Sequence, residues 1–310
     1  MRRRVSRSPA TRLSAVIVTY NSRDAVTAAM PALVAQMGPE DELVVVDNAS
    51  ADGTPSFVRD RFPAVRLIEQ ANLGLGAGWN RGIEHTVGRY VLILNADAWL
   101  TAGSLERLVA FADSRPDAAV IGPRLLNTDG SLQRSVRGFP TVWRLATEYF
   151  FLRKLAPRSR ALNAFYAGGF DHDAVREADF VMGACMLVRR SAIDEVGGLD
   201  ESFFLFSEET DWCYRFREAG WKVVFFPGAE CVHVGGASHG GRLFRENLGG
   251  HLRFLAKHAQ PGRAEQARRL LRIACRARGV IFRGARGAMY REAAAWLGSG
   301  DVAALLERPG

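Results

Sequence analysis

The sequence has few cysteines and no long apolar run. Its 310 residues include only four cysteines, which are widely spaced and form no C-x-x-C pair. This spacing favours neither a zinc site nor a disulfide framework, and it is typical of a protein of the reducing cytoplasm. No stretch of about 18 consecutive apolar residues occurs, so we expect no membrane-spanning helix. The apolar stretch after the basic start, residues 13–18, ends too soon for a signal-peptide core.

The chain has fewer acidic than basic residues. The chain has 41 Lys and Arg against 33 Asp and Glu, a net charge of +8, and most of the excess is arginine near the two ends. Positive potential attracts nucleotides, nucleic acid or anionic lipid. Because no nucleic-acid-reading motif is present, we expect no nucleic-acid partner. We predict a basic, disordered arm over residues 1–12.

Strand-like and helix-like segments alternate over the first 125 residues. The predicted strands are residues 14–20, 42–48, 65–70, 90–97 and 118–125, and the predicted helices are residues 25–36, 54–61, 78–86 and 104–114. Single helices between strands require crossover connections. The pattern therefore predicts an α/β fold with a Rossmann-like, mostly parallel central sheet flanked by helices. From residue 242 onward the pattern is helical and rich in arginine.

Several predicted strands end in short, mostly polar stretches. They are Thr19, Tyr20 and Asn21 at the end of the first strand, Asp47 and Asn48 at the end of the second, and Asn95, Ala96 and Asp97 at the end of the fourth. A single aspartate at a strand end is more often a turn former or a helix cap. Since the carboxyl ends of neighbouring parallel strands share one crevice, several such residues together predict a ligand site.

A glycine-rich turn follows the third predicted strand. It reads NLGLGAGWNRGI and contains Asn72, Gly74 and Asn80. Glycines let the backbone approach a ligand, and a helix that begins near Gly78 would offer N–H groups to a phosphate. The spacing differs from G-x-G-x-x-G and the turn does not follow the first strand, which weakens the alternative of a nicotinamide-dependent, Rossmann-like oxidoreductase.

The stretch SEETDWCYRFREAGW predicts a helix over residues 208–219 with Ser207 as its N-cap. At about 100° per residue, the apolar side chains form one stripe, with Glu209 near its middle, Glu208 near its edge and Asp211 well off it. Compensation of the helix dipole explains Glu208 and Asp211 but not an inward Glu209. An apolar environment raises the pKa of a carboxyl group, as a general base requires.

Several motifs together resemble the family 2 inverting glycosyltransferases. They are VIVTYNS, VVVDNASADGT, NLGLGAGWNRGI, LNADAWL, DFVMGACMLVRRSAIDEVGG, FSEETDWCYRFREAGW and CVHVGGAS. The likeness covers residues 13 to about 240 and is closer to the bacterial rhamnosyltransferase-like branch that builds cell-wall and surface polysaccharides. The resemblance implies a GT-A fold and a nucleoside-diphosphate-sugar donor.

The resemblance also implies roles for individual residues. The base-recognition aspartate of the family falls on Asp47, and the second aspartate of its metal-binding D-x-D motif falls on Asp97. Its catalytic acidic pair falls on Glu208 and Glu209, and its late metal-associated histidine on His233. The implied cofactor is Mg²⁺ or Mn²⁺. Contacts with the acceptor are implied at Gly183, Ala184, Asp211 and Trp212.

The sequence departs from the family pattern at two positions. Asn95 replaces the first aspartate of D-x-D, so we expect the metal to be held weakly and mainly through the donor phosphates. The acidic pair is Glu-Glu where Glu-Asp is common, and we favour Glu209 as the base because motif position and helical phase both select it.

These features predict an enzyme that transfers a sugar, L-rhamnose in the resembled branch, from a dTDP- or UDP-linked donor to a glycan or polyprenyl-diphosphate-linked acceptor. The predicted catalytic domain spans residues 13–241, with a nucleotide-sugar half over 13–125 and an acceptor half over 126–241. Residues 242–310 form the helical extension. Its eight arginines over residues 263–286 are interleaved with apolar residues. This pattern suits either an anionic membrane on the cytoplasmic side or an ordinary packed helix.

Overall fold

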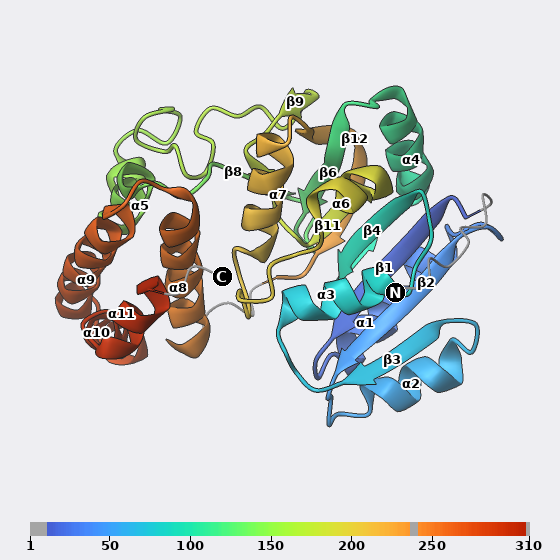
Figure 1. Ribbon diagram of the computed structural model, residues 1–310, viewed down its shortest axis with the longest axis horizontal. Helices are drawn as coiled ribbons and strands as arrows, with labels where there is room; N and C mark the ends of the chain where they lie inside the picture. The colour runs from blue at the N-terminus through green and yellow to red at the C-terminus, as the bar shows by residue number, and fades with distance from the viewer. Residues whose placement is uncertain (1–10, 236–240, 308–310) are drawn as a thin grey trace.

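One large sheet dominates the computed structural model, which describes residues 11–235 and 241–307 (Figure 1). Its main strands are β1 (Leu13–Thr19), β2 (Glu42–Asn48), β3 (Arg66–Gln70), β4 (Tyr90–Asn95), β5 (Ala98–Leu100), β6 (Ala118–Leu126), β11 (Cys185–Arg189) and β12 (Lys222–His233). Their order is β3-β2-β1-β4-β11-β6-β12-β5. The neighbours from β3 to β4 are parallel, as predicted, whereas β11 is antiparallel to both β4 and β6.

Helices cover both faces of this sheet. The helices of the first half are α1 (Arg23–Val34), α2 (Thr54–Arg61), α3 (Leu75–Glu84) and α4 (Ser104–Ser114). Side chains of α1 and α4 pack into the core on one face, and those of α3 pack into the core on the other. Helix α3 begins at Leu75, three residues before the predicted start, because the Leu75 N–H donates to the carbonyl of Phe204, 2.8 Å away, in a distant loop.

In the middle of the chain, strands and helices no longer alternate regularly. It contains the short strands β7 (Leu132–Gln133), β8 (Val136–Arg137), β9 (Arg176–Glu177) and β10 (Phe180–Val181), the helix α5 (Val142–Tyr149) and the 3₁₀ turn η1 (Leu152–Lys154). Strands β8 and β10 form a separate two-stranded sheet, while β7 pairs with β6 in the antiparallel direction. Two further helices, α6 (Arg190–Val196) and α7 (Glu208–Glu218), pack on the main sheet.

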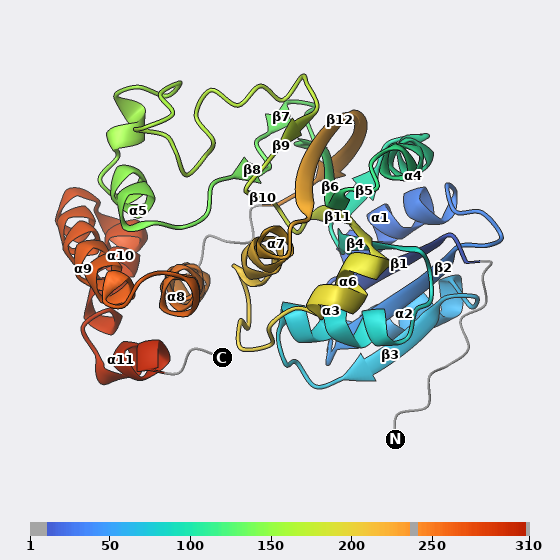
Figure 2. The same cartoon turned by 45° about the horizontal axis from the view of Figure 1, so that its top comes forward.

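Four helices complete the described chain. They are α8 (Gly241–His258), α9 (Arg263–Ile281), α10 (Gly284–Trp296) and α11 (Gly300–Glu307). They share a third core with Leu145 and Tyr149 of α5, so this helical unit also includes a segment from the middle of the chain (Figure 2). Among the described helices, none combines the length and apolar character needed to cross a membrane.

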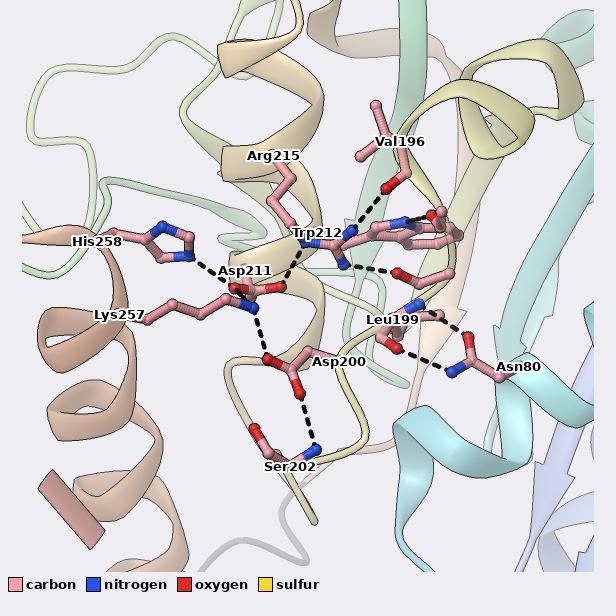
Figure 3. A network of polar contacts seen from close by, with 12 residues as sticks. Asn80, Val196, Leu199, Asp200, Ser202, Asp211, Trp212, Arg215, Lys257 and His258 are labelled. Carbon is pink, nitrogen blue, oxygen red and sulfur yellow. Dashed lines mark hydrogen bonds and ion pairs between the residues drawn. The ribbon is translucent and has the colours of Figure 1, made fainter. Parts of the chain in front are cut away.

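A buried polar network joins α7 to α8 (Figure 3). The Asp211 carboxylate, which is fully buried, lies 2.8 Å from Nε of Arg215, 2.9 Å from Nζ of Lys257 and 2.7 Å from Nε2 of His258. Lys257 also contacts Asp200 at 2.5 Å. The network therefore fixes the helix of the acidic pair against the helical extension.

The N-terminal boundary of the fold differs from the prediction. Residues 1–10 of the predicted arm lie outside the described residues. Its last residue, Arg12, pairs with Asp41 at 2.8 Å and with Glu106, so Arg12 belongs to the folded domain.

Candidate active site

The ends of β1 and β2 hold a buried carboxylate. Asp47 is 1% exposed, and its Oδ1 accepts a hydrogen bond of 2.6 Å from Oγ1 of Thr19. Its Oδ2 accepts one of 2.8 Å from the N–H of Ser50. Asn21 adopts a left-handed φ of 48° and accepts from the N–H of Ala51 at 2.8 Å, which ties the two loops together. The ring of Tyr20 is exposed beside them.

The glycine-rich turn is positioned by contacts within the protein. Nδ2 of Asn48 donates to the carbonyl of Gly74 at 3.1 Å, and Oδ1 of Asn72 accepts from the N–H of Gly74 at 3.2 Å. Gly74 has a φ of +104°, and a Cβ there would lie 2.5 Å from the carbonyl oxygen of Phe204. This glycine is therefore required by the close approach of the loop that precedes α7.

Asn80 is used by the same loop. Its Nδ2 donates to the carbonyl of Leu199 and its Oδ1 accepts from the N–H of Leu199, each at 2.8 Å (Figure 3). The prediction of Asn80 as a donor-binding residue is therefore corrected, because both ends of its amide already hold this backbone. Asn80 acts by positioning the loop.

The end of β4 meets the end of β12. Pairing of β5 with β12 places His233 opposite Ala98, and Nε2 of His233 lies 3.4 Å from Oδ1 of Asp97 and 3.4 Å from Nδ2 of Asn95. Burial raises the pKa of Asp97, but its contacts with His233 and with the N–H of Gly235 lower it more, so the net shift is downward. The Asp97 carboxylate is therefore ionised at neutral pH.

Gln133 contacts Nδ1 of His233, the ring nitrogen other than the one that approaches Asp97. The sequence does not indicate this role. Oε1 of Gln133 lies 2.8 Å from Nδ1 of His233, while its Nε2 donates to Oδ1 of Asn127 at 3.0 Å. With the amide oriented in this way, the network assigns the proton of a neutral imidazole to Nδ1. A neutral ring in this tautomer leaves Nε2 without a proton, as a metal ligand requires, whereas the hydrogen bond that lowers the pKa of Asp97 belongs to the ring that also carries a proton on Nε2.

The acidic pair occupies the first turn of α7 behind a strained backbone. Phe206 and Ser207 have left-handed φ angles of 69° and 71°, which non-glycine residues rarely adopt. Ser207 stands at the N-cap, as predicted, although its side chain makes no capping hydrogen bond. Such strain is typical of functional sites, where the surrounding packing holds the backbone in place.

The two carboxyl groups differ in burial. Glu208 is 2% exposed, whereas Glu209 is half-buried, the reverse of what the helical phase predicts. Burial and the nearby charge of Glu209 raise the pKa of Glu208 well above its usual value, and its Oε2 has no hydrogen-bond partner. Burial raises the pKa of Glu209 to about 6. Glu208 therefore holds its proton more tightly than an ordinary carboxyl group, while Glu209 is largely ionised at neutral pH and available as a base.

A short backbone segment links Glu209 to the end of β4. A Cβ on Gly183 would lie 3.6 Å from Cβ of Glu209 and 2.8 Å from the ring of Trp79. The next residue, Ala184, accepts a hydrogen bond of 3.0 Å from the N–H of Asn95. The structure therefore brings Glu209 and Asn95 next to neighbouring residues of one segment, Gly183-Ala184.

Two predicted acceptor residues lie inside the protein. Asp211 and Trp212 are both fully buried. Asp211 belongs to the network with Lys257, and Nε1 of Trp212 donates to the carbonyl of Gly197 at 2.9 Å. Their prediction as acceptor contacts is corrected, because these side chains face α8 and the loop after α6.

Arg137 is a second residue that the sequence analysis missed. Its guanidinium lies 4.4 Å from the centre of the Tyr166 ring, and its Nη1 donates to the carbonyl of Arg134 at 2.7 Å. Its charge favours ionised Glu209 and so opposes the upward shift in the pKa of Glu209. It makes no ion pair with any carboxylate in residues 11–235 or 241–307.

Comparisons with known proteins agree with this arrangement. The family model described as Glycosyl transferase family 2 matches residues 14–197. The N-acetylglucosaminyl-diphospho-decaprenol L-rhamnosyltransferase of Mycobacterium tuberculosis is 33% identical over 233 residues, which cover 71% of this chain and 75% of that protein.

The fold of the chain is similar to that of solved glycosyltransferase structures. The mannosyltransferase PcManGT from Pyrobaculum calidifontis, in complex with GDP-Man and Mn²⁺, matches with a TM-score of 0.56 at 18% identity over 96% of this chain and 83% of its own. GalNAc-T7 with UDP, GalNAc and Mn²⁺ matches with a TM-score of 0.57 at 14% identity over 80% of this chain and 48% of its own. These likenesses confirm the predicted GT-A fold. Because the family model matches more than half of the sequence, the protein belongs to the family 2 glycosyltransferases.

Proposed function

We propose that the protein transfers L-rhamnose from a dTDP- or UDP-linked donor to a polyprenyl-diphosphate-linked N-acetylglucosamine, in cell-wall or surface polysaccharide synthesis. The observation that carries this proposal is the 33% identity to the L-rhamnosyltransferase, which extends over most of both chains. Such a lipid-linked acceptor would place the reaction at the inner face of a membrane, with the protein in peripheral contact.

The donor would bind across the carboxyl ends of β1, β2 and β4. The Asp47 carboxylate, held by Thr19 and Ser50, would accept a hydrogen bond from the ring N–H of uracil or thymine. Asn48 and Asn72 would support the neighbouring turn, and the exposed Tyr20 would flank the nucleotide. These assignments rest on the convergence of the strand ends.

The residues present fit a divalent ion that is completed by the donor. Asp97 offers a carboxylate and His233 an imidazole lone pair at the same point, with the amide of Asn95 beside them. In the described parts of the chain no group of three or more His, Cys, Asp or Glu side chains is placed to hold a metal, so the donor phosphates would supply further ligands. When bound, Mg²⁺ or Mn²⁺ would neutralise charge on the leaving diphosphate.

Glu209 would act as the general base. Its carboxylate would take the proton of the acceptor hydroxyl while that oxygen attacks the anomeric carbon. The new C–O bond forms on the face opposite the diphosphate, the old C–O bond breaks, and its electron pair leaves with the nucleoside diphosphate. The configuration at the anomeric carbon is therefore inverted.

The test is a transfer assay with a panel of dTDP-, UDP- and GDP-sugars and a short-chain diphosphate-linked N-acetylglucosamine, read by mass spectrometry. We expect transfer of rhamnose, and its loss in Asp97→Ala and Glu209→Gln. The control Asp129→Asn changes an exposed carboxylate. A fully active Glu209→Gln enzyme would refute the assigned base, and efficient transfer of another sugar would refute the assigned donor.

The oxidoreductase alternative has no support. The glycine-rich turn lies within the matched family region, and its glycine Gly74 packs against the protein's own loop. A thermal-shift assay separates the two functions, because dTDP or UDP with Mn²⁺, and not NAD, is expected to raise the melting temperature.

A further inference from the structure

The outward face of α9 alternates arginine with exposed aliphatic residues. Arg269, Ile273, Arg276 and Val280 recur at spacings of four, three and four residues, which places them along one side of the helix. Ile273 is 59% exposed and Val280 is 85% exposed. The opposite side of α9 packs into the third core, so this face points away from the protein, at the edge of the molecule (Figure 2).

The segment after α5 lies beside the end of α9. The ring of Phe151 lies 6.1 Å from that of Phe282, just past the end of α9, which places the two segments side by side. Close to this contact, Leu155 is 76% exposed and Ile281 is 67% exposed. Lys154 lies over the Phe151 ring at 4.8 Å and adds a further cation.

Apolar exposure is concentrated here. Of the twelve large apolar side chains that are exposed in the described residues, five belong to α9 and to the segment beside its end. They are Phe150, Leu155, Ile273, Val280 and Ile281. A helix face that only meets water does not need such side chains, whereas an interfacial helix pairs them with arginine and lysine.

The charge of this face is largely uncompensated. Arg276, Arg283 and Arg286 form no ion pair within the described residues, and Arg286 lies over the ring of Phe282 at 4.1 Å. Arg269, by contrast, is paired with Glu265 at 2.7 Å. Unpaired cations beside apolar side chains are complementary to a surface that offers both negative charge and hydrocarbon.

We propose that the outer side of α9 and residues 150–155, here called the α9 face, dock onto a lipid bilayer that contains anionic lipids. The inference deepens the proposed function and rests on it in one respect, since a lipid-linked acceptor must be reached at such a surface. The aliphatic side chains would enter the headgroup region while the arginines bind lipid phosphates.

The experiment is co-sedimentation of the full-length protein with vesicles of phosphatidylcholine alone or of equimolar phosphatidylcholine and phosphatidylglycerol. We expect binding to the anionic vesicles that weakens as salt is raised. The variants Ile273→Ser/Val280→Ser and Arg276→Glu/Arg283→Glu are expected to weaken it about tenfold or more. The matched control Val34→Ser/Arg61→Glu, exposed on α1 and α2, is expected to bind like the wild type.

The outcomes separate the docking face from the reaction. Circular dichroism melts verify that each variant is folded. If the α9-face variants lose vesicle binding but keep transfer to a water-soluble acceptor, both proposals stand. If vesicle binding follows the prediction but no rhamnose is transferred to any acceptor, only the proposed function fails. Unchanged binding in both variants, no binding to anionic vesicles at low salt, or tighter binding to duplex DNA through the same residues would overturn the docking face.

Discussion

At the scale of single residues, Glu209 and Arg137 predict how the rate of transfer depends on pH. A base whose pKa is about 6 must lose its proton first, so kcat/KM should rise with pH and level off above that value. The positive charge of Arg137 of β8 acts on Glu209, and Glu209 in turn raises the pKa of Glu208 and of Cys213 on the same helix. In Arg137→Gln the rising limb should move to higher pH, because a charge that favours the carboxylate is lost.

The measurement is a profile of kcat/KM on both sides of that pH for wild type and Arg137→Gln. Arg61→Gln, an exposed change on α2, serves as the control and should leave the profile unchanged. A rising limb that stays in place in Arg137→Gln would show that Arg137 does not tune the base.

The raised pKa of Glu209 also predicts a stability effect. A folded-state pKa of about 6 against an ordinary 4.5 means that ionisation opposes folding as pH rises between these values. Glu209→Gln should therefore raise the free energy of unfolding by about 2 kcal/mol at neutral pH, from about 1.4 kcal/mol for each pKa unit. The gain should vanish in acid, below the ordinary carboxyl pKa.

Urea unfolding at neutral and at acidic pH measures this gain. Glu218→Gln, an exposed change on the same helix, should change stability little at either pH. An equal gain for Glu209→Gln at both pH values would contradict the assigned pKa shift.

Gln133 predicts an effect on metal binding. Replacing it by leucine removes the acceptor of the His233 Nδ1 proton, which lies 2.8 Å away, and frees the ring to turn from Asp97. Loss of such a partner weakens metal affinity by about 10- to 100-fold. Isothermal titration calorimetry with Mn²⁺ in the presence of dTDP measures this metal affinity directly, without turnover. An unchanged affinity, equal to that of the exposed control Gln266→Leu, would remove Gln133 from the site.

At the scale of elements, the Asp211 network between α7 and α8 predicts a large contribution to the free energy of unfolding. Asp211→Ala leaves Lys257 and Arg215 without their buried partner, which should lower the free energy of unfolding by about 3 kcal/mol or more. Urea denaturation measures the change. Asp117→Ala breaks ion pairs with Arg115 and Lys222 that are partly exposed and should cost less than about 1 kcal/mol. Equal costs would contradict the assigned importance of burial.

Local patterns predicted most elements of the first half. Helices α2 and α4 and strand β2 have the predicted bounds, because caps, turns and periodicity determine them within a few residues. The early start of α3 and the antiparallel direction of β11 depend on contacts with distant segments, such as that between Leu75 and Phe204. Such contacts leave no periodic signal in the sequence.

The candidate site was predictable to a similar extent. Strand ends and motif resemblance located Asp47, Asp97 and the acidic pair, but helical phase misjudged which glutamate is buried. Glu208 is covered because α3 approaches it, with a Cβ on Gly76 only 3.5 Å from that of Glu208. Gln133 and Arg137 reach the site through short strands of the irregular middle segment, where neither spacing nor composition identifies them.

At the scale of the whole molecule, the chain order and the packing order differ. Helix α5 comes from the middle of the sequence, yet Leu145 and Tyr149 pack among α8 to α11. Arg278 of α9 donates to the carbonyls of Glu148 and Tyr149, each at 2.9 Å, so the C-terminal helices also satisfy the end of α5. The part of the chain that contains the main sheet is therefore connected to the four C-terminal helices twice, through α5 and through the Asp211 network.

This double connection predicts that the extension cannot be removed without damage. A chain that ends at residue 240 would expose the apolar side of α5 and leave the buried Asp211 without Lys257 and His258. We expect it to aggregate or to unfold without a cooperative transition, as judged by size-exclusion chromatography and circular dichroism. Removal of α11 alone, by ending the chain at residue 299, spares both connections and should leave a chain that elutes without aggregation and melts cooperatively. If the chain that ends at residue 240 also eluted without aggregation and melted cooperatively, the sheet domain would be independent of the helices, and the coupling argued from α5 and Asp211 would be wrong.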